Sequence, residues 1–234
     1  EVRVVFCGAG AAGFATAKHF VALGVLKENL ILTDIDGVVY RGRENNGYLE
    51  ELASDTDKRT LPEALEGADA FVGVSVGGLL SPEMLTSMAK DPIVFALANP
   101  TPEIAYNLAR QTRPDVIMAT GRSDYPNQIN NVIAFPYIFR GALDVRARAV
   151  NEAIKIATTR AIAALAKAPV PQEVLADSPG LTFGPDYIIP KPFDPRLRVE
   201  LPVAIAAAAM ETGLARRPVD LDAYRLRLSA TLAP

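Results

Sequence analysis

Half of the 234 residues are apolar, 22% are charged, and the net charge is −3. The length suits one α/β domain with a sizeable core, and the acidic balance without a basic, aromatic-rich stripe argues against nucleic acid. No run approaches the roughly 18 apolar residues of a membrane span. The single cysteine, Cys7, excludes an internal disulfide and fits a reducing, cytoplasmic compartment.

The chain opens on a strand, a glycine-rich turn and a helix. Val2–Phe6 is a β-branched and aromatic run, and a helical pattern covers Ala11–Leu23. Between them lies G-x-G-x-x-G, whose first glycine permits a tight turn, whose second admits a pyrophosphate, and whose third lets helix and strand pack closely. The phosphates would lie at the positive end of the helix. The predicted cofactor-binding residues here are Gly8, Gly10, Ala11, Ala12 and Gly13.

Asp34 follows the second predicted strand, Leu30–Thr33, twenty-one positions after Gly13. An acid about 20 residues beyond the glycines is the usual ligand of the adenosine ribose in dinucleotide-binding domains. The alternative is an acid that only caps the following turn at Gly37. The combination of strand, helix, second strand and acid favours the ribose ligand.

Strands and helices alternate further along the chain. Three more strands are predicted at Ala70–Val74, Ile93–Leu97 and Val116–Ala119, and helices at Leu61–Glu66, Pro82–Ala89 and Pro102–Arg110. This alternation predicts an α/β fold with a doubly wound, Rossmann-like parallel sheet. Its ligand crevice would lie at the carboxyl ends of the strands. Ser75, Val76 and Asn99 are expected there.

The last part of the sequence is helical and rich in alanine. We expect residues 1–147 to form the dinucleotide-binding core, and residues 148–234 to form a helical extension that packs on the same domain. Helices are predicted at Val132–Ala147, Val150–Ala168, Val199–Thr212 (ending at Gly213) and Asp220–Leu232. The proline-rich stretch between residues 169 and 195 predicts an ordered loop with one helical turn near Glu173.

A loop rich in amides precedes the first of these helices. It carries Asn127, Gln128, Asn130 and Asn131. Each amide both donates and accepts hydrogen bonds, so the loop suits a polar ligand with carboxylates or a carboxamide. Turn and capping preferences explain only one or two of the four. We expect Asn130 or Asn131 to be an N-cap, and Asn127 and Gln128 to be ordinary loop residues.

The glycine motif and the amide loop together resemble the cofactor-binding domain of bacterial and archaeal malic enzymes. The matching pieces run in the same order over most of the chain: Gly8–Gly13, Asp34–Gly37, Gly73–Gly78, Phe95–Thr101, Ala119–Ala147 and Ile188–Arg196. The resemblance implies oxidation of malate by a nicotinamide cofactor, then decarboxylation to pyruvate and CO2. It also implies that Asn99 contacts the nicotinamide ribose or the substrate, and that Asn130 and Asn131 bind malate or the carboxamide.

The resemblance also implies what this chain lacks. In the family a Lys, a Tyr and the acidic ligands of Mg²⁺ or Mn²⁺ lie in a lobe that precedes the glycine strand. This sequence begins at that strand, so we expect it to need an N-terminal catalytic lobe and to hold no metal and no catalytic residue alone. Because dimers are usual in the family, the resemblance also implies a homodimer. Two alternatives stay open: a related oxaloacetate decarboxylase, and a non-catalytic nucleotide-binding or regulatory domain.

The residues after Asp34 bear on the choice between NAD and NADP. Family members that use NADP often place a hydroxyl and a basic residue there, whereas this chain has Ile35 and Asp36. A carboxylate at position 36 would repel a 2′-phosphate. Arg41 and Arg43 lie near enough to oppose that effect. The sequence favours NAD and leaves NADP possible.

Overall fold

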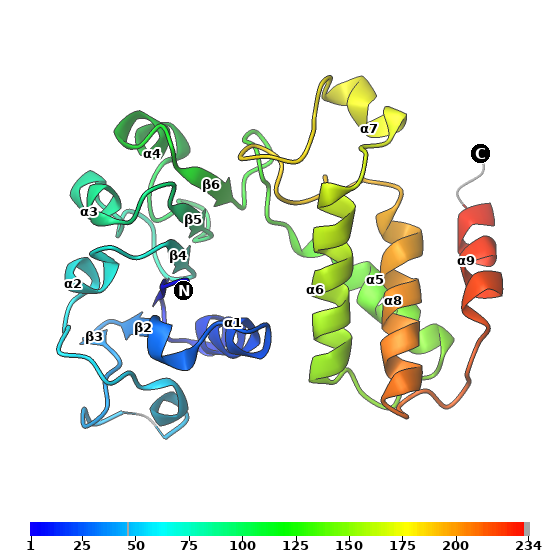
Figure 1. Cartoon of the computed structure of the whole chain (residues 1–234), viewed down its shortest axis with the longest axis horizontal. Helices are drawn as coiled ribbons and strands as arrows, with labels where there is room; N and C mark the ends of the chain where they lie inside the picture. The colour runs from blue at the N-terminus through cyan, green and yellow to red at the C-terminus, as the bar shows by residue number, and fades with distance from the viewer. Residues whose placement is uncertain (46, 232–234) are drawn as a thin grey trace. The chain divides into compact units, whose positions relative to one another are not determined.

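The structure, a computed structural model, describes residues 1–45 and 47–231. The chain divides into two compact units, residues 1–126 and residues 127 onward. They are coloured from blue to green and from green to red in Figure 1. We describe each unit by itself.

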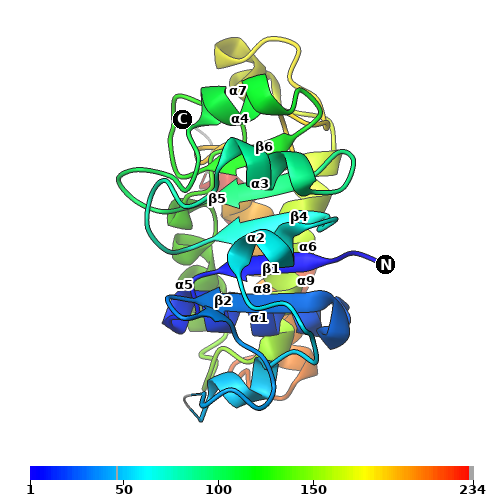
Figure 2. The ribbon, with the colours of Figure 1, turned by 90° about the vertical axis from the view of Figure 1, so that its left-hand side faces the viewer.

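The first unit is built on a six-stranded sheet in the order β3-β2-β1-β4-β5-β6. Five strands are parallel, and Figure 2 shows them side by side. All five were predicted to within three residues, whereas the two-residue β3, antiparallel to β2, was not. The strands are β1 Val4–Cys7, β2 Leu30–Asp34, β3 Gly37–Val38, β4 Ala70–Gly73, β5 Ile93–Ala96 and β6 Ile117–Thr120.

Helices cover both faces of this sheet. Successive strand residues point to opposite sides, and in β1 the residues on both sides are apolar and buried. Val4 and Phe6 of β1 lie in the core on the α1 face, whereas Val5 and Cys7 lie in the core on the α2, α3 and α4 face. In Figure 2, α2 and α3 lie in front of the strands. The predicted doubly wound α/β fold is therefore confirmed. The helices are α1 Ala11–Ala22, α2 Leu61–Leu65, α3 Pro82–Ser87 and α4 Tyr106–Thr112, with 3-10 turns η1 Lys27–Asn29 and η2 Leu49–Leu52.

Helix α4 begins four residues later than the sequence predicts. Pro102 was expected in its first turn, but residues 102–105 form a loop. The carbonyl oxygens of Pro102 and Glu103 accept the N–H groups of Gly78 and Leu80, at 3.1 and 3.0 Å. These bonds join the loop after β5 to the loop after β4. The local proline signal therefore marks a junction between two loops instead of a helix start.

The second unit is a helical cluster around α8. Helices α5, α6 and α9 all pack on it, and nine residues of α8 are buried. Gly213 follows its C-cap with a φ of +68°, as predicted for the residue that ends this helix. Position 232, the predicted end of the last helix, lies outside the described residues. The elements are η3 Asn131–Ile133, α5 Phe135–Asp144, α6 Glu152–Lys167, α7 Gln172–Asp177, α8 Leu197–Glu211 and α9 Leu221–Ala230.

The boundary between the units lies earlier than the expected residue 147. Residues 127–147, which the sequence assigned to the dinucleotide-binding core, cluster with the C-terminal helices. The physical reason is the close packing of α5 on α8, where Gly141 lies against Ile205. Among the described residues, no helix is long and apolar enough to cross a membrane.

The proline-rich segment of the second unit is ordered by one buried ion pair. Asp194 is 1% exposed, and the guanidinium of Arg196 binds it through both Nε and Nη2. Arg196 also donates to the carbonyl of Pro169, at 2.9 Å. The pair therefore ties the start of the segment to its end, and α7 supplies the helical turn predicted near Glu173.

We predict that Gly141→Ala destabilises the second unit. A Cβ at this position would lie 2.8 Å from Cβ and Cγ2 of Ile205 and from the carbonyl oxygen of Pro202. Overpacking of this kind costs about 1–3 kcal/mol, so the thermal midpoint should fall. Leu143→Ala is the control, because Leu143 lies on the same helix and is 69% exposed. Equal midpoints for the two variants would contradict the packing of α5 on α8.

Candidate functional site

The glycine turn after β1 brings the first helix against the first strand. Gly8 has a φ of +115°, and its N–H donates to the carbonyl of Thr33 at 2.9 Å. A Cβ on Gly13 would lie 1.7 Å from the carbonyl oxygen of Gly8. No other residue fits there without displacing the turn. The glycine roles predicted from the motif therefore have a steric basis at Gly8 and Gly13.

The N-terminus of α1 is left open to a ligand. Its N-cap is Gly10, which offers no side-chain hydrogen bond, and its first turn carries no acidic side chain. A Cβ on Gly10 would meet no atom within 4 Å. The free N–H groups of the first helical turn, which includes Ala11, Ala12 and Gly13, are thus available to an anion such as a phosphate.

A cavity of about 880 Å³ lies at the carboxyl edge of the parallel strands. It joins the glycine turn, the end of β2 and the loop after β4, which are the places where the sequence predicts the cofactor. Of the predicted residues, Gly8, Gly10, Asp34, Ser75 and Val76 line it. The other lining residues are Cys7, Ala9, Thr33, Ile35, Asp36, Gly37, Tyr48, Leu49, Arg59, Thr60, Leu61 and Leu79.

Asp34 is held by an arginine that was considered only as a neighbour of the 2′-phosphate. The guanidinium of Arg43 binds both carboxylate oxygens of Asp34, and both side chains are less than one-fifth exposed. Arg43 also donates to the carbonyl of Val38 at 3.0 Å. Hydrogen bonding to Asp34 raises the pKa of Arg43. Asp34, the predicted ribose ligand, therefore forms a bidentate ion pair with Arg43.

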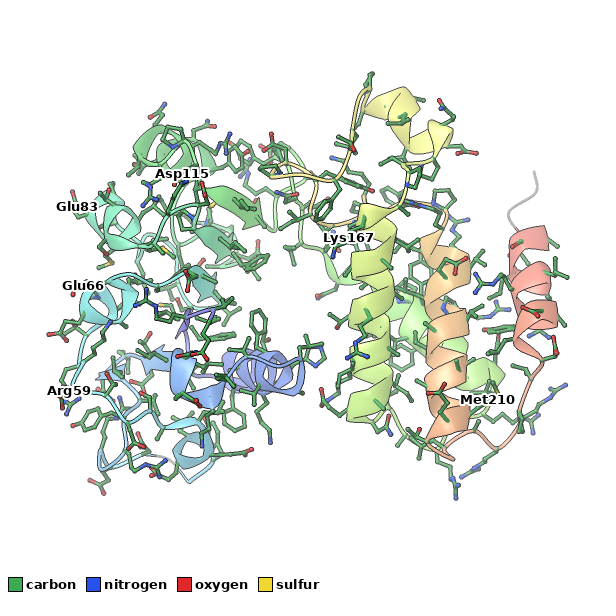
Figure 3. All side chains as sticks on the ribbon, viewed as in Figure 1. Arg59, Glu66, Glu83, Asp115, Lys167 and Met210 are labelled. Carbon is green, nitrogen blue, oxygen red and sulfur yellow. The ribbon has the colours of Figure 1, made fainter. Side chains whose placement is uncertain are left out.

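The other charged residues near Asp34 are arranged differently. Arg41 is turned to Asp55, with 2.9 Å between Nε and Oδ1. Asp36 is exposed and donates its backbone N–H to Asp34 at 2.9 Å. Arg59, labelled in Figure 3, lines the cavity and stacks its guanidinium on the ring of Tyr40, 3.7 Å from the ring centre. At this end the cavity is therefore lined by the carboxylates of Asp34 and Asp36 and by the guanidinium of Arg59, and Arg43 pairs with Asp34.

Ser75 lines the cavity, but its polar groups are engaged by a residue that the sequence did not single out. Its N–H and hydroxyl both donate to the carboxylate of Glu103, at 3.1 and 3.4 Å. Glu103 is fully buried in the loop between β5 and α4. In a single sequence, Glu103 cannot be distinguished from an acidic residue of an exposed turn. Only the fold shows that it lies beneath the crevice.

Asn99 and the amide pair lie outside the cavity lining. Asn99 is exposed three residues beyond β5. In the second unit, Asn130 is the N-cap of η3, with Oδ1 accepting the N–H of Val132 at 3.0 Å, and both Asn130 and Asn131 are exposed. Asn130 is thus an N-cap, but of the 3-10 turn and not of the long helix, because α5 begins at Phe135 with Ala134 as its N-cap.

Asn127, expected to be an ordinary loop residue, has a structural role. It is 4% exposed, donates to the carbonyl of Pro185 at 2.7 Å, and accepts the N–H of Ile188 at 2.9 Å. Its side chain thus joins the amide loop to the proline-rich segment. The sequence does not reveal this role because the partners are about 60 residues away.

The described residues contain no cluster of three or more His, Cys, Asp or Glu side chains that could hold a metal ion. Asp34 in the cavity lining is paired with an arginine, and Glu103 beneath it accepts backbone N–H groups.

Comparison with known proteins agrees on one family. A family model described as "Malic enzyme, NAD binding domain" matches residues 1–176. The NADP-dependent malic enzyme of Halomonas elongata is 56% identical over 93% of this chain and 52% of its own length. The NAD-dependent malic enzyme of Rhizobium meliloti is 49% identical over 98% of this chain and 30% of its own length. The chain thus spans about half the length of the first relative and under a third of the length of the second.

Solved structures give the same result. The crystal structure of the malic enzyme of Entamoeba histolytica matches 98% of this chain and 47% of its own, with a TM-score of 0.85 and 30% sequence identity. The structure of the malic enzyme of Pyrococcus horikoshii matches 98% of this chain and 53% of its own, with a TM-score of 0.82 and 34% identity.

We predict that Cys7 reacts slowly with iodoacetamide at neutral pH. Burial raises the pKa of its thiol, and the thiolate is the reactive form. The alkylation rate should therefore still climb at pH values where an ordinary thiol, with a pKa of about 8.5, is already fully ionised and reacts at a constant rate. Mass spectrometry of the native chain and of the urea-unfolded chain would measure this. A native rate that levels off with the unfolded one would contradict the burial of Cys7.

Proposed function

Since the chain belongs to the family of malic enzyme NAD-binding domains, we propose that it is the dinucleotide-binding half of an enzyme that oxidises malate and decarboxylates the product to pyruvate and CO2, with reduction of NAD(P). The chain's part in this reaction is geometry. It would hold the nicotinamide against the substrate carbon, and correct positioning lowers a barrier by several kcal/mol, up to roughly 10 in the best cases.

The observation that carries this proposal is the cavity at the carboxyl edge of the sheet. It begins at the open N-terminus of α1, where Gly8 and Gly10 leave room for phosphates, and reaches Asp34 at the end of β2. The loop after β4, with Ser75 and Val76, forms another part of its wall. A dinucleotide has its pyrophosphate between two halves, so it needs a ribose site, an anion site and a further wall in this order, and the ends of the neighbouring strands β2, β1 and β4 supply them in that order.

We propose that the site takes both cofactors and binds NADP more tightly than NAD. The sequence favoured NAD because Asp36 would repel a 2′-phosphate. Two features of the structure oppose that repulsion: Arg43 neutralises Asp34, and Arg59 adds a guanidinium to the cavity lining. The Halomonas relative, 56% identical, is NADP-dependent. A guanidinium such as that of Arg59 can bind a 2′-phosphate through two parallel hydrogen bonds.

The rest of the proposal concerns the complete enzyme. We propose that a lobe preceding this chain supplies the base, the acid and the Mg²⁺ or Mn²⁺ site, since the chain spans only part of its relatives. Exposure of Asn130 and Asn131 leaves these amides available for malate or the carboxamide, and Asn99 for the nicotinamide ribose. We further propose a homodimer in the cytoplasm, where a reduced Cys7 is expected.

Titration of this chain with NADP and with NAD tests the proposal. We expect calorimetry to detect both, with NADP bound about tenfold more tightly, equal to ~1.4 kcal/mol. Binding of neither would contradict the dinucleotide site, and tighter NAD would restore the preference inferred from the sequence. In the complete enzyme, malate-dependent reduction of NADP would separate the malic enzyme from an oxaloacetate decarboxylase without net redox chemistry.

Arg43→Ala should weaken NADP binding more than NAD binding. Without the guanidinium, the carboxylate of Asp34 is unpaired, so it repels a 2′-phosphate but still accepts a ribose hydroxyl. The measurement uses the reduced forms, NADPH and NADH, whose dissociation constants follow from the change in their fluorescence on binding. Arg41→Ala is the matched control, because it removes an arginine two positions away whose partner is the exposed Asp55. Equal losses for NADP and NAD in Arg43→Ala would refute this role.

A further inference from the structure

A buried carboxylate beneath the crevice has no part in the site predicted from the sequence. Glu103 has 0% exposure, and none of the ion pairs found among residues 1–45 and 47–231 includes it. Its oxygens are satisfied by neutral donors. Oε1 accepts the N–H of Ser75 at 3.1 Å and its hydroxyl at 3.4 Å, and Oε2 accepts the N–H of Ala98 at 3.1 Å.

The end of β4 is shaped to admit this carboxylate. A Cβ on Gly73, the last residue of the strand, would lie 2.3 Å from the carboxyl carbon of Glu103. Gly73 has no positive φ that would require glycine. The absent side chain at position 73 is therefore explained by the space that Glu103 occupies.

The carboxylate also fixes the direction of a short hydrogen-bond chain. The hydroxyl of Ser75 donates to Oε1 of Glu103. The oxygen of that hydroxyl is then free to accept the S–H of Cys7, whose Sγ lies 3.3 Å away. One side chain thereby links the ends of three neighbouring strands: β1 at Cys7, β4 at Ser75 and β5 at Ala98.

The loops after β4 and β5 are also joined by backbone hydrogen bonds, but these lie further from the strand ends than the bonds of Glu103. The N–H groups of Gly78 and Leu80 reach the carbonyls of Pro102 and Glu103 further along the loops. Val74 and Leu97, the first residues after β4 and β5, bond to the carbonyls of Cys7 and Gly73. Ser75 and Ala98, which follow them, are held by the Glu103 side chain. Ser75 lines the cavity and Ala98 precedes Asn99, so the carboxylate acts where the loops meet the cofactor site.

We propose that Glu103 is a positioning residue of the dinucleotide site, which sets the arrangement of the loops after β4 and β5 that the bound cofactor requires. This inference rests on the proposed function. It assigns no contact between Glu103 and cofactor or substrate. The effect passes through Ser75 and Ala98, whose backbone positions depend on a two-oxygen acceptor between them.

Glu103→Gln tests the inference with the least change in shape. The amide keeps one acceptor oxygen but turns an NH2 group toward a backbone N–H, so one loop loses its bond. We expect the dissociation constant of NADPH, followed by its fluorescence, to rise about tenfold or more. We also expect faster amide hydrogen exchange at Ser75 or Ala98 in the cofactor-free chain, measured by NMR.

Asp115→Asn is the matched control. Asp115, labelled in Figure 3, also accepts a backbone N–H, that of Asp91 at 2.9 Å, and lies at the opposite edge of the sheet, just before β6. The change from carboxylate to amide is the same, and loss of its pairing with Arg113 should lower stability. We expect NADPH binding within about twofold of the unaltered chain, since the crevice is untouched.

Each outcome decides a separate question. Unaltered NADPH affinity and unaltered exchange in Glu103→Gln would overturn the positioning role while the proposed function stands. An unaltered chain that binds neither dinucleotide would overturn the proposed function and this inference with it. Should Glu103→Gln fail to fold, Glu103→Asp retains the carboxyl group but is one methylene too short to reach both loops. Native affinity in Glu103→Asp would then overturn the inference.

Discussion

The close approach of α1 to β1 is the constraint on which the candidate site depends. Because a Cβ on Gly13 would lie 1.7 Å from the carbonyl oxygen of Gly8, the helix reaches this position only with glycine there. The approach places the N-terminus of α1 at the carboxyl edge of the sheet, uncapped by any side chain. The ends of the other parallel strands meet at the same edge, so Asp34 and Ser75 line one cavity with the glycine turn.

The carboxyl groups of Asp34 and Glu103 at this edge have different kinds of partner, and the difference follows from how deeply each is buried. Asp34, partly exposed, is paired with Arg43. Glu103, fully buried, is satisfied by two N–H groups and a hydroxyl. A guanidinium neutralises the carboxylate that borders the cavity, whereas neutral donors hold the buried carboxyl group without a second buried charge to desolvate. The ion pair of Asp34 with Arg43 suits a position that borders a charged ligand. The neutral donors around Glu103 suit a position that has to stay rigid.

The sequence predicted the fold nearly completely, because the strands are short apolar runs and glycine or proline marks their ends. It missed β3, which has two residues and no pattern, and it placed the start of α4 too early, because Pro102 resembles a helix start until its carbonyl is seen to bind Gly78. It also predicted the glycine turn and the acid after β2. Arg43 was noticed only as a charge, since nothing in a sequence shows that its guanidinium reaches Asp34.

Glu103 and Asn127 were missed for a common reason. Both satisfy backbone groups of another loop: Glu103 accepts the N–H of Ser75, 28 residues away, as well as that of Ala98, and Asn127 binds Pro185 and Ile188, 58 and 61 residues away. Such a role depends on which loops the fold brings together and leaves no periodic or local signal. Loops carry few backbone bonds of their own, and so a binding surface built from loops needs side chains of this kind to hold its shape. The polar residue most important to such a surface can therefore lie beneath it, out of contact with the ligand.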